Sequence, residues 1–310
     1  MSNFYRLIIN FMILLSLTLP YTVNAQEPEV SDIVSNVVQS TLSIYKTVVV
    51  KKLEQDGLGA SADYTSQKGF VSLPEEFMRR MAINAIAKHR RSGEKQFTFT
   101  FAPGGTGLLS VKLAEPSMPA EQKALVIAKV LDGMIRAVRG TYTSAVIQKL
   151  RRDGAGAAID HTSQKGFVPL PAVFMRLIAA DVISKAGNQF FISLRSRWNL
   201  NREQELRDDF ERAGWTFLAK QQETQLAAGK SLRNFHWEPY VQVVTAGAKK
   251  NLRYISADPA ASRSCVTCHN AWENREDIKT MRAKQDVEVG KTFKQHELLG
   301  VLSIVVSLED

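Results

Sequence analysis

The segment DGAGAAIDHTSQKGFVPLPAVFMRL (153–177) decides the organisation of this chain, because a close copy of it, DGLGASADYTSQKGFVSLPEEFMRR, occupies residues 56–80. The match extends without gaps over residues 42–88 and 139–185. Self-similarity at a fixed spacing indicates a repeat architecture, and two copies indicate the duplication of a domain and not a solenoid. We therefore divide the chain into copy one and copy two.

Both copies predict the same elements in the same order. A proline is well placed in a first helical turn, where its missing N–H would have no partner, and β-branched and aromatic residues favour strands. An amphipathic helix is followed by a Gly-rich turn, the TSQKGFV loop, a helix that begins at Leu-Pro, and a strand. We predict the first helix over Val30–Leu53 and Glu121–Leu150, the second over Pro74–Lys88 and Pro171–Lys185, and the strand over 96–101 and 189–194.

Copy two continues much further than copy one. Copy one ends with a second predicted strand (108–113) and a linker (114–120), whereas copy two adds the elements of a complete domain. These are a helix over 201–222, strands over 240–246, 251–257 and 300–308, and a cysteine motif. The pattern predicts an α+β fold with a partial copy over residues 26–118 and a full domain over residues 119–310.

The N-terminal residues have the features of a secretion signal. A single Arg6 precedes an apolar run from Leu7 to Leu19, and Val23 and Ala25 place small residues at a cleavage site. The run has about 13 residues, short of the roughly 20 that a membrane-spanning helix needs. We expect residues 1–25 to be a signal peptide and the mature protein to be periplasmic, without a membrane span.

The charge pattern constrains the partners of the chain. The 310 residues carry a formal net charge of +9, but Lys and Arg alternate with Asp and Glu and form no long basic block. Such interspersed charges are typical of solvated surfaces, although an acidic partner is compatible with them. Export excludes nucleic acid as a partner.

The two cysteines lie together in Cys265-Val266-Thr267-Cys268-His269. Cys-x-x-Cys-His is the attachment motif of c-type haem. The two thiols, three residues apart on a helical turn, project from one face and can each form a thioether with one haem vinyl group. The adjacent His269 is then placed to ligate the iron. The sequence predicts one covalent haem c per chain, attached by the cytochrome c maturation machinery.

Two other interpretations of the cysteines are less consistent with the sequence. A redox-active Cys-x-x-Cys normally accompanies a βαβ pattern, which is absent. A structural zinc site needs four ligands, and the chain has no second Cys or Cys-His pair.

Candidates for the remaining haem contacts are less specific. The haem propionates need basic or hydrogen-bonding partners. The candidates are Arg253, Tyr254, Arg195 and Arg197. The alternative is that these arginines lie at strand ends and face solvent. The candidates for apolar haem contacts are Trp198, Phe191, Phe235 and Trp237, although core packing is the default for aromatic residues.

The sixth iron ligand is open at this point. His161 is one candidate, because copy one has Tyr64 at the matching position, and His236, flanked by aromatic residues, is another. Met175 is a less specific candidate, because Met78 occupies the matching position in the copy without cysteines. A sixth position that is open or occupied by water is a further alternative.

Four segments of copy two resemble the PAS-like single-c-haem family first catalogued as a domain of unknown function. They are KGFVPLPAVFMR (165–176), SLRSRWNLNREQELRDDFERAGWTFL (193–218), LRYISADPAASRSCVTCHN (252–270) and HELLGVLSIVVSLE (296–309). The resemblance implies a PAS-like antiparallel sheet with flanking N-terminal helices and His269 as the proximal ligand. Family members include cyanobacterial soluble haem proteins and bacterial sensor modules; some use a first-helix cysteine as sixth ligand, which this chain lacks.

These observations give three hypotheses for the function. The first is a redox- or gas-sensing haem module that reports to a redox or signalling partner, the second an electron-transfer cytochrome c, and the third a peroxidase-type enzyme. The sixth iron ligand separates them: two strong protein ligands favour electron transfer, and an exchangeable position favours sensing.

Overall fold

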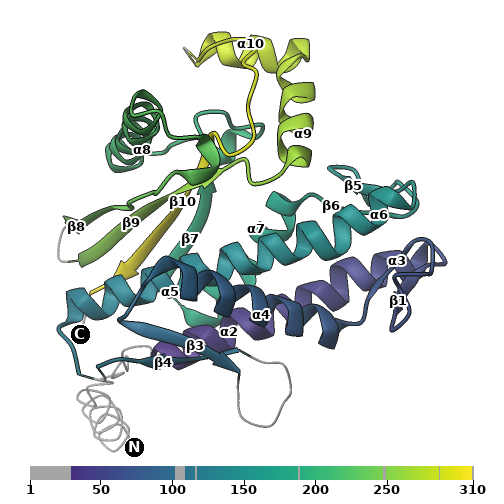
Figure 1. Cartoon of the computed structure of the whole chain (residues 1–310), viewed down its shortest axis with the longest axis horizontal. Helices are drawn as coiled ribbons and strands as arrows, with labels where there is room; N and C mark the ends of the chain where they lie inside the picture. The colour runs from purple at the N-terminus through teal and green to yellow at the C-terminus, as the bar shows by residue number, and fades with distance from the viewer. Residues whose placement is uncertain are drawn as a thin grey trace, which may run out of the picture.

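The structure is a computed structural model, and it describes residues 29–101, 109–115, 117–187, 189–246, 249–285 and 287–308. It combines helices with an antiparallel sheet, so the predicted α+β class is confirmed (Figure 1). The predicted signal peptide (1–25) lies outside the described residues.

The two copies contain the same elements in the same order up to their first long strand. In copy one these are α2 (Val30–Ile44), η1 (Tyr45–Val50), α3 (Lys51–Gln55), β1 (Gly59–Ser61), β2 (Phe70–Ser72), α4 (Pro74–Ser92) and β3 (Phe97–Phe101), followed by β4 (Leu109–Leu113). In copy two they are α5 (Ala120–Thr141), η2 (Tyr142–Ile147), α6 (Gln148–Arg152), β5 (Gly156–Ala158), β6 (Phe167–Pro169), α7 (Pro171–Ala186) and β7 (Phe190–Arg195).

Local sequence signals account for these boundaries. Pro74 and Pro171 occupy the first turn of α4 and α7, as predicted. Gly93 ends α4 in the left-handed conformation at φ 72°, which a residue with a side chain adopts less readily. Each long first helix is interrupted by one π-helical segment, η1 or η2, at the same place in the repeat. The repeat is therefore present in local structure as well as in sequence.

The remainder of copy two builds the sheet and the helices around it. These elements are η3 (Arg202–Gln204), α8 (Asp209–Ala227), η4 (Leu232–Asn234), β8 (Tyr240–Ala246), β9 (Lys249–Pro259), α9 (Arg263–Glu273), α10 (Glu276–Lys284) and β10 (Leu298–Ser307). The four long strands pair in the order β7-β10-β9-β8, with every neighbour antiparallel. The strands predicted from the sequence are confirmed.

The predicted helix over 201–222 is wrong at its start. Residues 202–204 form a separate 3₁₀ turn, and α8 begins only at Asp209. The reason is the N-cap at Asp208, whose side chain accepts a hydrogen bond from Glu211 N at 2.9 Å.

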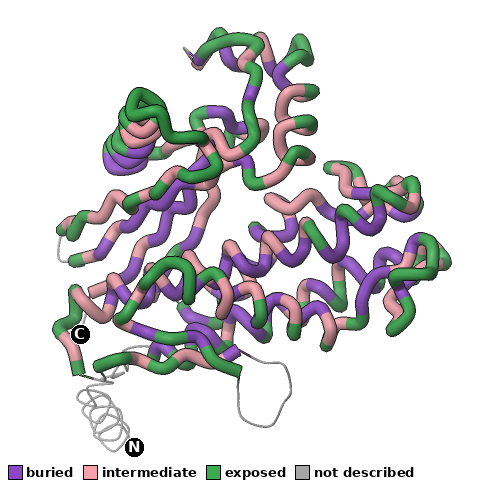
Figure 2. The backbone as a smooth tube through the Cα atoms, viewed as in Figure 1, coloured by how far each residue is buried: buried purple, intermediate pink, exposed green. Residues whose placement is uncertain are grey.

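Two apolar cores lie on opposite faces of the sheet (Figure 2). The first core joins both copies to one face, which α5 crosses; its members include Val37, Met81, Leu131, Phe174, Tyr254 and Ile304. The second core lies on the other face, beneath α8, and Cys265 and Val266 of α9 pack against it; its members include Trp198, Phe210, Trp215, Ile255, Phe293 and Val301. The predicted boundary between residues 118 and 119 thus divides one shared core, and the two-domain division stays a prediction.

The copies pair reciprocally through their TSQKGFV loops. The carboxylate of Asp56 accepts a hydrogen bond from Gly166 N, and that of Asp153 accepts one from Gly69 N, each at 2.7 Å. Lys149 Nζ donates to the Gln67 carbonyl at 2.9 Å, and Lys52 makes the matching contact with copy two. In the same way α2 packs against α7 and α5 packs against α4.

One continuous helix, Val30–Gln55, is long and apolar enough to cross a membrane by length and composition. Half of that apolar window is buried within the protein, and Val34, Val37 and Leu53 belong to the first core. The same properties are those of a core helix in a water-soluble protein.

Candidate functional site

The cysteine motif lies on α9, which follows β9 at the end of the sheet (Figure 1). The helix begins after Ser262, whose Oγ accepts a hydrogen bond from Cys265 N at 3.4 Å. Cys265, Cys268 and His269 are three and four residues apart, so they share one face of the helix. Both thiols are partly buried and neither forms a disulfide.

His269 is held in the form that a metal requires. Its Nδ1 is buried without a hydrogen-bond partner, and its ring packs edge-on against Phe293 with centroids 5.9 Å apart. Burial, and then the positive charges of Arg139 and Arg282, lower the pKa of His269 to about 4. The imidazole is therefore neutral at pH 7, and only a neutral imidazole binds a metal.

A buried ion pair fixes the far end of α9. Glu273 binds Arg282 of α10 at 2.6 Å, with 1% and 0% of their side chains exposed. Arg282 Nη1 also donates to the Asn199 carbonyl at 2.7 Å. Asn270 holds the segment after α10, because its Oδ1 accepts a hydrogen bond from Phe293 N at 2.8 Å. These contacts hold the helix that carries His269 against the second core.

Two arginines that the sequence analysis did not select lie beside the thiols. Arg139, near the end of α5, forms an ion pair with Asp258 of β9 and also interacts with the Cys265 thiol. On α6, Arg151 is close enough to Cys268 for its charge to oppose the increase that burial produces in the pKa of that thiol. The repeat contained a signal for both: copy one has Leu42 and Glu54 at these positions, so the two charges occur only in the copy that carries the cysteines.

Further polar contacts join α5 to the strand that leads into α9. Arg136 binds Asp132 at 2.8 Å, and its Nη2 donates to Ser256 Oγ at 2.9 Å. Ser256 Oγ in turn donates to Asp132 at 2.7 Å. This network holds the end of β9, and with it the start of α9, against α5.

The predicted propionate partners form other contacts. Arg253 binds Asp208 at 2.8 Å and stacks over Phe210, and Arg195 lies 3.7 Å from Glu211. Both therefore face α8. Tyr254 is buried on the opposite face of the sheet, where burial raises its pKa.

Arg197 is exposed. The propionate assignments thus stay predictions, and the structure does not bring these residues together around α9.

The two histidines considered as sixth ligands lie near the surface. His161 Nδ1 is 3.4 Å from the Ile159 carbonyl of its own loop. His236 Nε2 is 2.7 Å from Glu238 Oε1, and 73% of the side chain is exposed.

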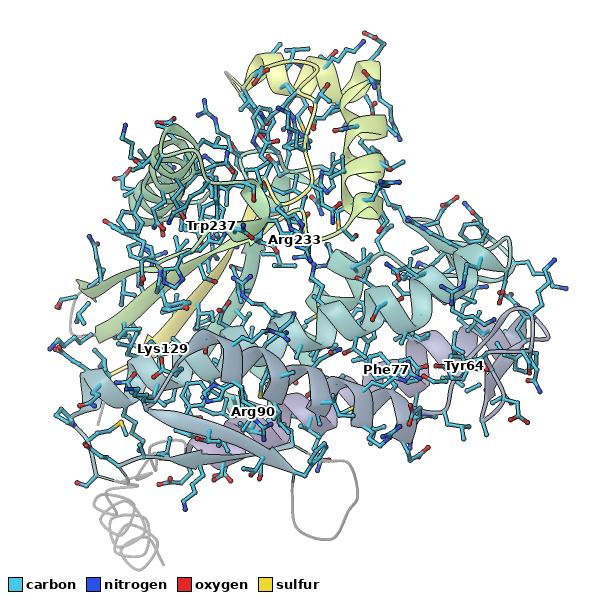
Figure 3. The ribbon with its side chains drawn as sticks, in the orientation of Figure 1. Tyr64, Phe77, Arg90, Lys129, Arg233 and Trp237 are labelled. Atoms are coloured by element: carbon cyan, nitrogen blue, oxygen red, sulfur yellow. The ribbon has the colours of Figure 1, made fainter. Side chains whose placement is uncertain are left out.

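The predicted aromatic contacts divide into two groups. Trp198 belongs to the second core and Trp237, labelled in Figure 3, packs against it. Cys265 packs against the same core. Phe235 packs edge-on against Trp237 with centroids 5.7 Å apart, whereas 44% of Phe191 is exposed. Trp272, one helical turn after Cys268, was not predicted, but it lowers the pKa of the Cys268 thiol and so opposes the increase that burial produces.

Two thiols and one neutral imidazole on a single helical face fit haem better than a bare metal ion. A haem brings four nitrogen ligands of its own, and the protein supplies covalent anchors and an axial ligand. The buried, unpartnered Nδ1 of His269 is consistent with a ring that lacks its intended partner. The residues present therefore fit a c-type haem.

The fold and the site define an α+β protein whose antiparallel sheet presents a Cys-x-x-Cys-His helix at one end. The chain belongs to the Tll0287-like family, which matches residues 115–307. The match begins just before α5 and ends with β10, so it covers copy two and not copy one. Comparisons with curated proteins and with solved structures found no match.

Proposed function

We propose that this protein is an exported, monohaem c-type protein that senses redox state or a diatomic gas in the periplasm. The observation that carries the proposal is the arrangement on α9: Cys265, Cys268 and a neutral, partly buried His269 on one face. Membership of the Tll0287-like family supports a haem-related module. The antiparallel sheet with long helices before it supports a PAS-like description of copy two.

When bound, haem supplies reversible one-electron chemistry and an iron centre able to take an exogenous ligand. The thiols of Cys265 and Cys268 anchor the ring, and His269 presents its lone pair without first losing a proton. The Glu273–Arg282 pair and Asn270 hold α9, and with it these three residues, in place. The Arg139–Asp258 ion pair joins the end of β9, which leads into α9, to α5.

Expression with the cytochrome c maturation system tests the proposal. The mature chain should gain the mass of one haem, and the band should stain for haem after denaturing electrophoresis. Cys265→Ser/Cys268→Ser should abolish the covalent haem, and His269→Ala should keep some of it with altered axial ligation. Haem that acid–acetone extracts completely from the wild-type protein would reject covalent attachment.

The electron-carrier alternative gives a different spectrum. A sensor should bind carbon monoxide in the ferrous state. A carrier with two strong protein ligands should stay low-spin in both oxidation states and show no change with the gas. His161→Ala and His236→Ala would then identify the second ligand.

A further inference from the structure

The thiol-bearing face of α9 looks toward the helix formed by α5, η2 and α6. Arg139 pairs with Asp258 at the end of β9, just before α9, and interacts with the Cys265 thiol, while the charge of Arg151 acts on the Cys268 thiol; both arginines belong to that helix. A haem joined to both sulfurs and ligated by His269 would therefore lie between this face of α9 and the α5–α6 helix.

The α5–α6 helix offers no strong iron ligand on that side. Residues 120–152 contain no histidine or cysteine. Their one methionine, Met134, is fully buried in the first core. A polar group of this helix that interacts with a thiol is the guanidinium of Arg139, whose side chain is 18% exposed.

Arg139 is fixed in direction but is not fully neutralised by its partners. Asp258 holds the guanidinium at the end of β9, and Arg136 and Lys88 add further positive charge nearby. Lys88 Nζ donates to the Arg136 carbonyl at 3.1 Å. Burial, and then the charges of Arg136 and Arg139, lower the pKa of Lys88 to about 8. Three cations thus lie together at this end of α5, where Asp132 and Asp258 supply two carboxylates.

We propose that Arg139 is the distal residue of this site and binds a small inorganic anion held at the sixth position of the haem. The inference rests on the proposed function, since it presupposes haem on α9. Arg139 would face such a haem from the α5–α6 helix, and its planar guanidinium can donate hydrogen bonds while its charge favours anions over neutral ligands. The matching residue of copy one, Leu42, can do neither.

The test compares an anion with a neutral ligand on the ferric holoprotein. In Arg139→Gln, the affinity for azide should decrease about tenfold, the size expected for one lost charge-assisted hydrogen bond. The affinity for imidazole, which is neutral, should stay nearly the same. Arg212→Gln on α8, where the arginine pairs with Asp209 on the surface, is the matched control and should change neither affinity.

A second variant keeps the inference testable if Arg139→Gln does not fold. Asp258→Asn removes the carboxylate that competes for the guanidinium, so azide should bind more tightly than to the wild type. Unchanged azide affinity in a haem-loaded Arg139→Gln or Asp258→Asn protein overturns the inference and leaves the proposed function intact. A wild-type protein that binds no azide at saturation also overturns the inference, since a protein side chain then holds the sixth position. A wild-type protein that carries no haem rejects both this inference and the proposed function.

Discussion

At the residue scale, the burial of His269 that prepares it for a metal also makes the apoprotein sensitive to acid. The folded-state pKa is about 4, while an unfolded histidine titrates near 6.5. Between these values the unfolded state binds more protons, so stability decreases as pH falls from about 6.5 to 4. From pH 7 to pH 5 we expect a loss of about 2 kcal/mol from this group.

Urea unfolding of the apoprotein at the two pH values measures this loss. In His269→Leu the contribution should disappear, and the variant should lose less stability between pH 7 and pH 5 than the wild type. Equal pH dependence in both proteins would show that His269 is not the group responsible.

The Glu273–Arg282 pair gives a second prediction at this scale. Because both side chains are buried, Glu273→Gln leaves an uncompensated guanidinium, at a cost of about 3 kcal/mol. The exposed pair of Arg275 and Asp277 is the control, and Asp277→Asn should cost far less, because solvent screens an exposed pair. Chemical unfolding measures both, and similar losses in the two variants would contradict the prediction.

The sequence predicted the residues of the site unevenly. Cys265, Cys268 and His269 are adjacent in sequence and require only one helical turn, so a local motif was enough to bring them together. Arg139 meets Cys265 only because α5 lies against the end of β9, a contact between distant segments. Arg253 and Arg195 were selected for their proximity in sequence to the motif or to a strand end, but the alternation of side chains along the strands directs them to α8.

At the element scale, the reciprocal loops predict matched effects in the two copies. Asp153→Ala leaves Lys149 buried without its carboxylate and Gly69 N without its acceptor. Asp56→Ala leaves Lys52 without its carboxylate and Gly166 N without its acceptor. Each variant should lose about 3 kcal/mol of stability, although only one of them lies in the copy with the cysteines.

Thermal unfolding of the two variants beside Asp63→Ala, an exposed loop control, measures these losses. A large effect of Asp153→Ala together with a negligible effect of Asp56→Ala would show that the pairing is not reciprocal in energy. The repeat predicted the elements on both sides of this pairing. It could not predict the pairing itself, because the hydrogen bonds join segments more than 80 residues apart.

At the scale of the whole molecule, copy one completes a core that copy two leaves open. Helix α2 covers α7, and α4 covers α5, so both faces are apolar where the copies meet. The same α5 also crosses the sheet and carries Arg139. Copy one therefore supports the helix that faces the cysteine motif, although it contributes no cysteine of its own.

Residues 119–310 expressed alone should consequently form a dimer. Without copy one, the apolar faces of α5 and α7 would meet water, and burial of such faces is the main favourable term in folding and association. A second copy of residues 119–310 carries the same Lys149–Asp153 pair and the same loop, so it can make the contacts that copy one makes in the full chain. Light scattering coupled to size exclusion should report a dimer for residues 119–310 and a monomer for residues 26–310. A stable monomer of residues 119–310 would show instead that copy two is an independent domain, as its sequence suggested, and that copy one serves some other partner.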